Sequence, residues 1–356
     1  MKKVVLGAMA LMCGSVIFGQ NFSDVFQLGD DNESTVIQVM ANDSWVEQIG
    51  DDNVSGVYQL GTNLSEVYQD GDDNESGVLQ IGLDNESFVL QEGDDNTSVV
   101  VQFGDDNDSY VDQWGDNNDS EVVQAGDDNV SFVEQWGDNN ESTVLQDGDD
   151  NESWVFQGGD FNTSIVTQDG DDNYSDTFQD GIGNFSEVIQ DGNNNYAEVD
   201  QMGFFNSSEI VQDGDFNYSV VEQVGFGNGS YVEQTGLGNI NGVNQLGLFN
   251  GSEVYQEGIL NISQVDQVGV LNYSVVDQFG ILNISEVDQT GILNGSDVSQ
   301  TGFWNTSEVL QDGNLNTSSV TQFGAFNSSE VTQINDGHMS TVTQVGIGNG
   351  SVVVQY

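Results

Sequence analysis

Constant and variable positions alternate along almost the whole chain in a unit of 11 residues, and the constant positions are polar except for one valine per unit. Aligned on a recurring glutamine, the unit reads N-x-S-x-V-x-Q-x-G-x-x, and its glutamines run from Gln27 to Gln355. The series has 31 members, of which the units ending at Gln48 and Gln69 are one residue short. Because Asn, Ser, Val and Gln occupy alternate positions, they share one face of an extended strand, whereas a helix would scatter them. The pattern therefore predicts 31 β-strands and no helix.

The constancy of this face predicts which side of each strand is buried. The residues between its members vary freely in size and charge, as Glu66, Tyr68 and Trp154 illustrate, so we expect them to face solvent. Valine is the only apolar residue on the inner face, so hydrocarbon burial is small. Stacked Asn and Gln amides would add hydrogen-bonded ladders, and serine would fill narrow positions and bond along its own row. Representative ladder residues are Asn74, Ser76, Val78 and Gln80 in one unit and Asn294, Ser296, Val298 and Gln300 in another.

Only four residues separate one glutamine from the next asparagine, as in Leu28-Gly29-Asp30-Asp31. A hairpin there would pair consecutive strands in a flat meander, whereas a β-arc would turn the same face of the next strand back across a core. We favour the arc because it buries the constant face completely. Strand n then pairs with strand n+2. The predicted fold is an all-β, amyloid-like two-sheet β-solenoid of about 15.5 coils of roughly 22 residues, about 75 Å long.

The first 19 residues do not follow the repeat. A basic start, Met1-Lys2-Lys3, precedes an apolar run from Val4 to Phe18, which is typical of a secretory signal peptide. We therefore assign 1–19 to a signal peptide and 20–356 to the repeat domain, and expect a secreted protein. The single cysteine, Cys13, lies in the first segment, where a lipid anchor is the less favoured alternative. No later stretch has the length of apolar sequence that a membrane span requires.

The repeat domain is strongly acidic. The chain has 60 Asp and Glu residues and two basic residues, Lys2 and Lys3, both in the first segment. With no cation to neutralise phosphates, the domain is not expected to bind nucleic acid or anionic lipid. Close packing of such chains would be favoured by cations, low pH or high salt.

No group of residues points to catalysis. The single histidine, His338, replaces a core asparagine in the degraded unit Ile334–Gln344, and we interpret it as drift or a local weak point. Asn-x-Ser formally matches the glycosylation sequon, but the strand pattern already requires that spacing. We predict a structural protein, not an enzyme, without a cofactor.

The segment Q-x-G-x-x-N-x-S-x-V-x-Q resembles the curlin repeat of the major curli fibre subunit. Gln69, Gly71, Asn74, Ser76 and Gln80 match that pattern, and the match recurs in nearly every unit. The resemblance implies a subunit of a secreted amyloid fibre of the biofilm matrix, exported through an outer-membrane pore and seeded by a minor nucleator subunit. Curlins usually carry a short non-repeat segment between the signal peptide and the first repeat, whereas here Asn21 already begins the first strand after the predicted signal peptide, and this chain is unusually long for the family.

Both ends of the predicted solenoid obey the repeat consensus. Soluble solenoids protect such strand edges with atypical repeats, charges or prolines, and this chain has no proline. Complementary open ends make a head-to-tail contact that cannot close, so we expect a homopolymer. The alternative is a monomeric β-solenoid, either a surface adhesin or an ice-binding module. The predicted assembly ends are Asn21, Ser23, Val25 and Gln27 at one end and Asn349, Ser351, Val353 and Gln355 at the other.

The turns change character along the chain. Later turns are apolar, for example Phe204-Phe205 and Ile259-Leu260, and either make lateral contacts between fibres or form variable surface. Early turns carry aspartate pairs, which either bind Ca²⁺ between coils or form a solvated acidic edge. The calcium candidates are Asp30, Asp31, Asp51, Asp52, Asp72 and Asp73.

Overall fold

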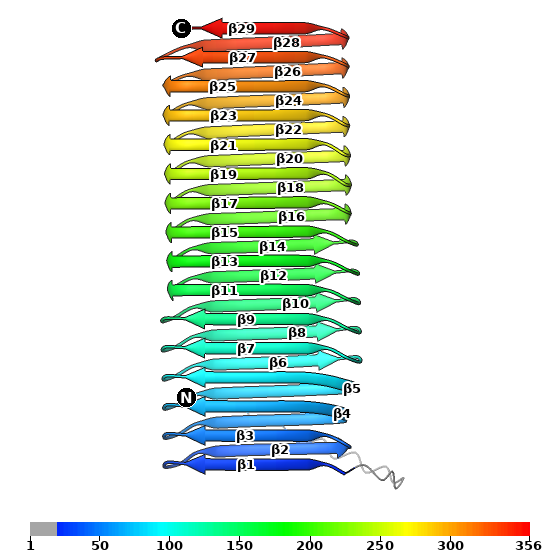
Figure 1. Cartoon of the computed structure of the whole chain (residues 1–356), viewed down its shortest axis with the longest axis vertical. Helices are drawn as coiled ribbons and strands as arrows, with labels where there is room; N and C mark the ends of the chain where they lie inside the picture. Colours follow the sequence, from blue (N-terminus) through cyan, green and yellow to red (C-terminus); the bar gives the residue numbers. More distant parts are fainter. Residues whose placement is uncertain (1–19) are drawn as a thin grey trace, which may run out of the picture.

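The computed structural model describes residues 20–356, which form a stack of parallel strands without a helix (Figure 1). The predicted signal peptide at 1–19 lies outside the described residues. The strands are β1 (Phe22–Leu28), β2 (Glu33–Met40), β3 (Asp43–Ile49), β4 (Val54–Asp70), β5 (Glu75–Glu92), β6 (Thr97–Phe103), β7 (Asp108–Trp114), β8 (Asp119–Ala125), β9 (Val130–Trp136), β10 (Glu141–Asp147), β11 (Glu152–Asp160), β12 (Thr163–Asp169), β13 (Tyr174–Ile182), β14 (Phe185–Asp191), β15 (Tyr196–Phe204), β16 (Ser207–Asp215), β17 (Tyr218–Phe226), β18 (Gly229–Leu237), β19 (Ile240–Leu248), β20 (Gly251–Ile259), β21 (Ile262–Val270), β22 (Tyr273–Ile281), β23 (Ile284–Ile292), β24 (Gly295–Phe303), β25 (Thr306–Asn314), β26 (Thr317–Ala325), β27 (Ser328–Ile334), β28 (Met339–Ile347) and β29 (Gly350–Gln355).

The strand count is 29 and not the predicted 31, because β4 and β5 each run through two units without a break. In these two strands the backbone stays extended around the bend, and the pairing between them shifts register between Thr62 and Leu64, next to a shortened unit. Every predicted unit is nevertheless present as extended chain. The difference therefore concerns where strands are divided, not the repeat.

Each strand pairs in parallel with the strand one full coil away, as a solenoid requires. β11 pairs with β13 so that Ser153, Val155 and Gln157 lie beside Ser175, Thr177 and Gln179. Above β5, odd and even strands run in opposite directions in Figure 1, which gives two facing stacks. The continuous β4 and β5 join both stacks into one hydrogen-bonded sheet. The β-arc connection and the n+2 pairing are confirmed, and the hairpin meander is excluded.

The inner face is buried along the stack and opens at both ends. Val46 is fully buried, and the inner valines from there to Val342 form one apolar cluster, in which Thr177 replaces valine in β13. In the first strand, the equivalent Val25 is 42% exposed because no coil covers it. The representative ladder residues in β5 and around β24 are all buried.

The turns bring the backbones of successive coils into close contact. Gly148 has a φ of 123°, and a Cβ added there would overlap the backbone carbonyl of Gly170 in the next coil. Two residues further on, the chain adopts left-handed φ values, 59° at Asp150 and 56° at Trp304. Asp and Asn tolerate this conformation better than bulky apolar residues do. The acidic early turns therefore suit the bend locally, whereas the apolar late turns carry backbone strain.

A search for membrane spans between residues 20 and 356 finds no helix that is long and apolar enough.

Candidate assembly site at the two ends of the solenoid

Two unbroken glutamine ladders run through the core, one in each stack. Gln135 donates from Nε2 to Oε1 of Gln157 at 2.9 Å, and Gln157 donates likewise to Gln179 at 2.9 Å. The same bond joins every glutamine to its counterpart in the next coil, up to Gln344 in one stack and Gln355 in the other. Each ladder is thus polar, with its N–H groups directed toward the C-terminal end and its carbonyl oxygens toward the N-terminal end.

The second amide proton of every ladder glutamine from Gln38 onward crosses the core. Nε2 of Gln157 also donates to the backbone carbonyl of Glu141, in the opposite stack, at 3.0 Å. Both N–H bonds of the buried amide are therefore satisfied, which is the condition under which a polar core is stable. These bonds tie the two stacks together, although valine is the only regular apolar contact between them.

The asparagine rows are also polar, but in the opposite direction. Oδ1 of Asn129 accepts from the backbone N–H and from Nδ2 of Asn151, at 3.0 and 3.1 Å. Nδ2 of Asn129 in turn donates to the carbonyl of Gly148 in the next turn at 2.7 Å. Asparagine carbonyl oxygens thus face the C-terminal end, where the glutamine ladders present N–H groups. Asparagine suits this position because its short amide can reach both neighbouring backbones at the bend.

The serine row differs from the expectation that its members hydrogen-bond along the row. The Oγ atoms of Ser153, Ser164 and Ser175 are buried and have no partner, as holds for most of the inner serines. Adjacent strands lie about 4.8 Å apart, so hydroxyls with the same orientation are too far apart to bond; in the described part of the chain one serine–serine bond along the row is present, from Ser340 to Ser318 near the C-terminal end at 3.3 Å. Serine is therefore accommodated for its small size, and Ala197 occupies the same position in β15.

Replacing a central serine with alanine is expected to stabilise the fold. In Ser164→Ala, removal of a buried hydroxyl without a partner should raise the free energy of unfolding by about 1 kcal/mol. Denaturant midpoints would measure the change, with Ser207→Ala on the outer face of β16 as the matched control, expected to change little. A loss of stability in Ser164→Ala alone would mean that the hydroxyl has a partner in solution.

The two ends of the solenoid expose complementary hydrogen-bonding groups. At the C-terminal end, Gln344 and Gln355 each use one amide proton on a backbone carbonyl, of Ser328 and Met339, and none of the described residues accepts the second. At the N-terminal end, no described donor reaches Oε1 of Gln27, or Oε1 of Gln38 in β2. The end residues predicted from sequence lie on these surfaces: those of β1 are exposed, and those of β29 are half-buried. The repeat pattern predicts these end residues, but it does not predict the direction in which the hydrogen bonds of each ladder run.

His338 continues the asparagine row near the C-terminal end. Its backbone N–H donates to Oδ1 of Asn316 at 3.0 Å, and its Nε2 lies 2.9 Å from the carbonyl oxygen of Ile334. The register of β28 on β26 is unbroken beside it. The predicted weak point therefore leaves the strand pairing intact, although the turn before it lacks the usual glycine and uses Asn335 at a φ of 73°.

The aspartate pairs of the early turns contribute hydrogen bonds between coils. Oδ1 of Asp51 accepts the backbone N–H of Asp30 at 2.7 Å, and Oδ1 of Asp72 accepts that of Asp51 at 2.8 Å. The second aspartate of each pair, such as Asp52, has a left-handed backbone conformation. Burial is the main cause that raises the pKa of Asp52, and the neighbouring carboxylates of Asp73 and Asp31 raise it further. Within residues 20–356, no three acidic, His or Cys side chains are grouped to hold a metal ion. Calcium binding at these turns stays a prediction.

One carboxylate on the outer face is unusually buried. Asp112 in β7 is only 6% exposed, and its Oδ1 has no hydrogen-bond partner. Burial raises the pKa of Asp112 to about 6. A hydrogen bond from Trp114 opposes this shift, and the carboxylate of Glu134 adds to it. A folded-state pKa above the ordinary value of 3.8 means that the folded protein binds the proton more tightly than the unfolded chain. Ionised Asp112 therefore destabilises the folded protein. This penalty disappears as the pH falls from about 6 to 3.8 and the carboxylate takes up its proton.

Asp112→Asn is expected to be more stable than the unchanged protein at pH 7 and equally stable at pH 4. The amide keeps the shape of the side chain and removes the charge, so the difference should vanish between about pH 6 and 4 as Asp112 takes up its proton. Thermal unfolding midpoints at a series of pH values would test this. A stability difference that stayed constant with pH would show that charge is not the cause.

Comparison with known proteins identifies one family. The family model described as the curlin-associated repeat matches seven segments, which together cover more than half of the 356 residues. No curated protein matches the chain. The matched segments are residues 63–93, 84–115, 115–148, 137–170, 170–203, 206–236 and 294–324.

Proposed function

Because the chain belongs to the curlin-associated repeat family, we propose that it is the structural subunit of a secreted, curli-type amyloid fibre. Subunits add head to tail, and the fibre forms part of the extracellular matrix of a bacterial biofilm. The repeated inner face of the fold is used for stacking.

The opposite directions of the two kinds of ladder carry this proposal. When the C-terminal end of one subunit meets the N-terminal end of another, the free amide protons of Gln344 and Gln355 face the free Oε1 atoms of Gln27 and Gln38. Head-to-head contact would place like groups opposite one another, and unsatisfied buried amides are costly. Head-to-tail growth is therefore the arrangement that the ends favour, and it leaves new open ends after every addition.

The number of units fixes how neighbours are oriented. β29 holds the last of 31 units and pairs with β27, so the free edge for the next strand is that of β28, in the other stack. In a seamless fibre, β1 of the next subunit covers β28, and its β2 covers β29. Neighbouring subunits are then related by a rotation of about 180° around the fibre axis. A subunit-resolved map with purely translational stacking would contradict this junction.

Electron microscopy of the purified protein tests the proposal directly. Protein diluted from denaturant should form unbranched filaments without any partner. Discrete rods roughly 75 Å long that persist for days would contradict it and favour the monomeric adhesin or ice-binding module. Filament growth with and without a chelator would test calcium binding at the six aspartates.

A nucleator subunit and an export pore are proposed partners by analogy with the family. A minor subunit that exposes the same N-terminal or C-terminal ladder groups would provide a first edge for growth. Filament growth without a lag after such a subunit is added would support this role.

A further inference from the structure

Five successive bends on one edge of the solenoid contain no charged residue. They follow the odd-numbered strands β15, β17, β19, β21 and β23, on the left in Figure 1. The eight bends before them on this edge and the two bends after them each contain aspartate. We name the five uncharged bends the apolar edge, which consists of residues 202–205, 224–227, 246–249, 268–271 and 290–293.

The apolar edge exposes more hydrocarbon than the surface of a monomeric protein ordinarily does. Twelve of its side chains are roughly half exposed, and each leaves on the order of 80 Å² in solvent. Together they expose roughly 900 Å², whereas the largest apolar patch on a typical monomer covers about 300–600 Å². A standard protein interface buries about 800 Å² on each partner. The exposed side chains are Met202, Phe204, Phe205, Val224, Phe226, Leu246, Leu248, Phe249, Val268, Leu271, Ile292 and Leu293.

The backbone conformation of these bends shows that apolar residues are not there for local stability. Phe205 and Phe249 both have a φ of 55°, in the left-handed region that bulky side chains disfavour. Earlier bends on the same edge hold Asp52 or Asn117 at this position, and Asp and Asn adopt the left-handed conformation more readily. The apolar residues therefore destabilise the isolated subunit, and burial against another surface would offset that strain.

Three aromatic rings give the apolar edge a preformed centre. Phe226 packs edge-on against Phe205 and Phe249, with ring centroids 5.6 and 5.2 Å apart. Side chains that are already held by such contacts lose little conformational entropy when a partner covers them. The edge is thus prepared for contact with a second apolar surface.

We propose that the apolar edge binds the same edge of a second copy of this chain, with the two copies antiparallel around a two-fold axis. Such a contact is self-complementary, and when it is centred on residues 246–249 it places 202–205 of one copy beside 290–293 of the other. The first six aspartate-containing bends of each copy then lie beyond the C-terminal end of the other copy. A parallel arrangement would oppose all ten such bends, and residues 20–356 contain no Lys or Arg to neutralise them.

A second copy fits the apolar edge better than a lipid surface does. Aspartate-containing bends border the edge on both sides, at residues 180–183 and 312–315, so a continuous apolar layer would bury carboxylates as well. The contact lies away from both ends of the solenoid, so the inference does not depend on fibre formation. In filaments, the same contact would join neighbours side by side.

Sedimentation velocity of freshly diluted protein, before filaments appear, would measure this contact. We expect a reversible dimer. Phe205→Asn combined with Phe249→Asn should weaken the dimer at least about tenfold, since two apolar side chains leave the interface. Circular dichroism should show an unchanged fold, because asparagine tolerates the left-handed φ at both positions.

Phe161→Asn combined with Phe216→Asn is the matched control. These phenylalanines also have left-handed φ values, 58° and 57°, and are 60% and 59% exposed. They lie outside the apolar edge, and each directly follows an aspartate, so the dimer should be as stable as that of the unchanged protein. Equal weakening in both double variants, or a monomer at every concentration, would overturn the contact. Monomers that bind neutral phosphatidylcholine vesicles would overturn it in favour of a lipid surface.

Cross-linking under mild oxidation would establish the orientation of the two copies, because residues 20–356 contain no cysteine. In a mixture of the two single variants, Phe204→Cys should form a disulfide with Ile292→Cys, and neither variant should cross-link to itself. Cross-linking of each variant to itself would overturn the antiparallel arrangement. Filaments without a dimer would contradict this inference alone, whereas dimers without filaments would contradict the proposed function alone.

Discussion

Glutamate at positions 344 and 355 is expected to abolish filament growth while leaving the solenoid folded. In Gln344→Glu/Gln355→Glu, each carboxylate can still accept the ladder bond from Gln322 or Gln333 of the coil below. It can no longer donate an amide proton to the next subunit, nor to the backbone carbonyl of Ser328 or Met339, so the last coil should lose some stability while the coils below it stay folded. At pH 7 the side chains that contact the next subunit are then charged acceptors, and they face the Oε1 acceptors of Gln27 and Gln38. We expect elongation to slow by at least about 100-fold, since two buried hydrogen bonds per junction become unfavourable contacts.

The direction of growth makes this prediction specific. The N-terminal end of the variant is unchanged, so it should add to a free C-terminal end of an unchanged filament and then block it. Small amounts of variant should therefore shorten wild-type filaments in electron micrographs. Thr343→Glu combined with Val354→Glu adds the same two charges on the exposed outer face of the same strands and should permit growth.

Two results would contradict the ladder junction. Normal filaments of the glutamate variant would show that the terminal glutamines do not form the contact. Loss of growth without any capping of wild-type filaments would indicate a misfolded end. Near pH 4, where glutamate regains a proton to donate, growth of the variant should recover toward that of wild-type protein at the same pH.

A methyl group at Gly82 is expected to disrupt the stack more than any surface change. Gly82 lies in β5 at a φ of 146°, and a Cβ there would overlap the carbonyl of Gly104 in the next coil. Both contacting groups are backbone, so no side chain can move aside. We expect Gly82→Ala to lower the free energy of unfolding by about 4 kcal/mol or more, with local loss of pairing between β5 and β6.

Gly77→Ala, five residues earlier in the same strand, is the matched control. Gly77 has no atom within 4 Å of the position that its Cβ would occupy, so its stability should be unchanged or slightly higher. Hydrogen–deuterium exchange would locate the effect, which should be confined to the coils around residue 82. Equal exchange in both variants would contradict the close approach of successive turns.

The sequence alone was sufficient to predict the architecture, because every unit imposes the same alternation of buried and exposed positions and the same short connection. Period two determines which residues share a face, and complete burial of that face favours a β-arc to the facing strand over a hairpin. In-register pairing then follows, since a shift by one residue would turn valine and glutamine outward. The sequence did not predict the division into 29 strands. The bends in β4 and β5 stay extended because of their pairing with neighbouring coils, which the repeat pattern does not specify.

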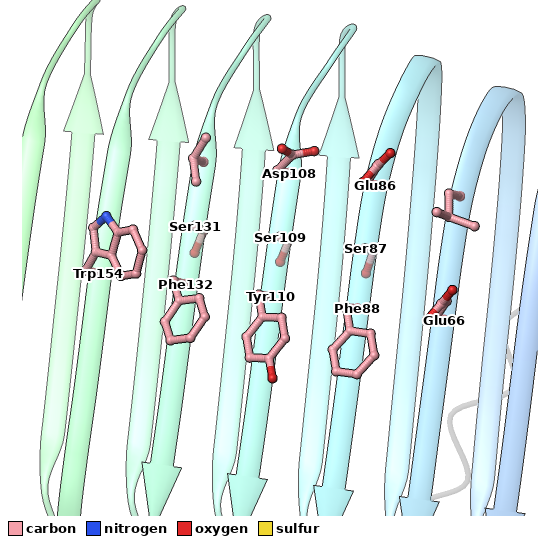
Figure 2. Close-up of a pocket in the computed structure, with 12 residues that line it drawn as sticks. Glu66, Glu86, Ser87, Phe88, Asp108, Ser109, Tyr110, Ser131, Phe132 and Trp154 are labelled. Atoms are coloured by element: carbon pink, nitrogen blue, oxygen red, sulfur yellow. The ribbon is translucent and has the colours of Figure 1, made fainter.

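The row of stacked aromatic rings on the outer face of the odd-numbered stack (Figure 2) could in part have been found from the sequence. Phe88, Tyr110, Phe132 and Trp154 recur at intervals of 22 residues, which is one coil of the predicted solenoid. The recurrence predicts neighbours, but not the nearly parallel stacking that covers the ring faces. That arrangement depends on the side-chain rotamers, which are set by packing between the rings of adjacent coils.

What the sequence determined by itself is the buried face, the partner of each strand, and the repeat consensus of the first and last strands. What only the tertiary structure decided is the direction of the hydrogen bonds. Gln157 donates to the next glutamine toward the C-terminal end, whereas Asn129 accepts from the next asparagine on that side and donates there only to a backbone carbonyl, although both carry the same amide group. The longer side chain of glutamine reaches the next glutamine and the opposite stack, whereas asparagine reaches the backbone of the bend. Composition and spacing are the same for either amide orientation, so only the packed coils could fix it.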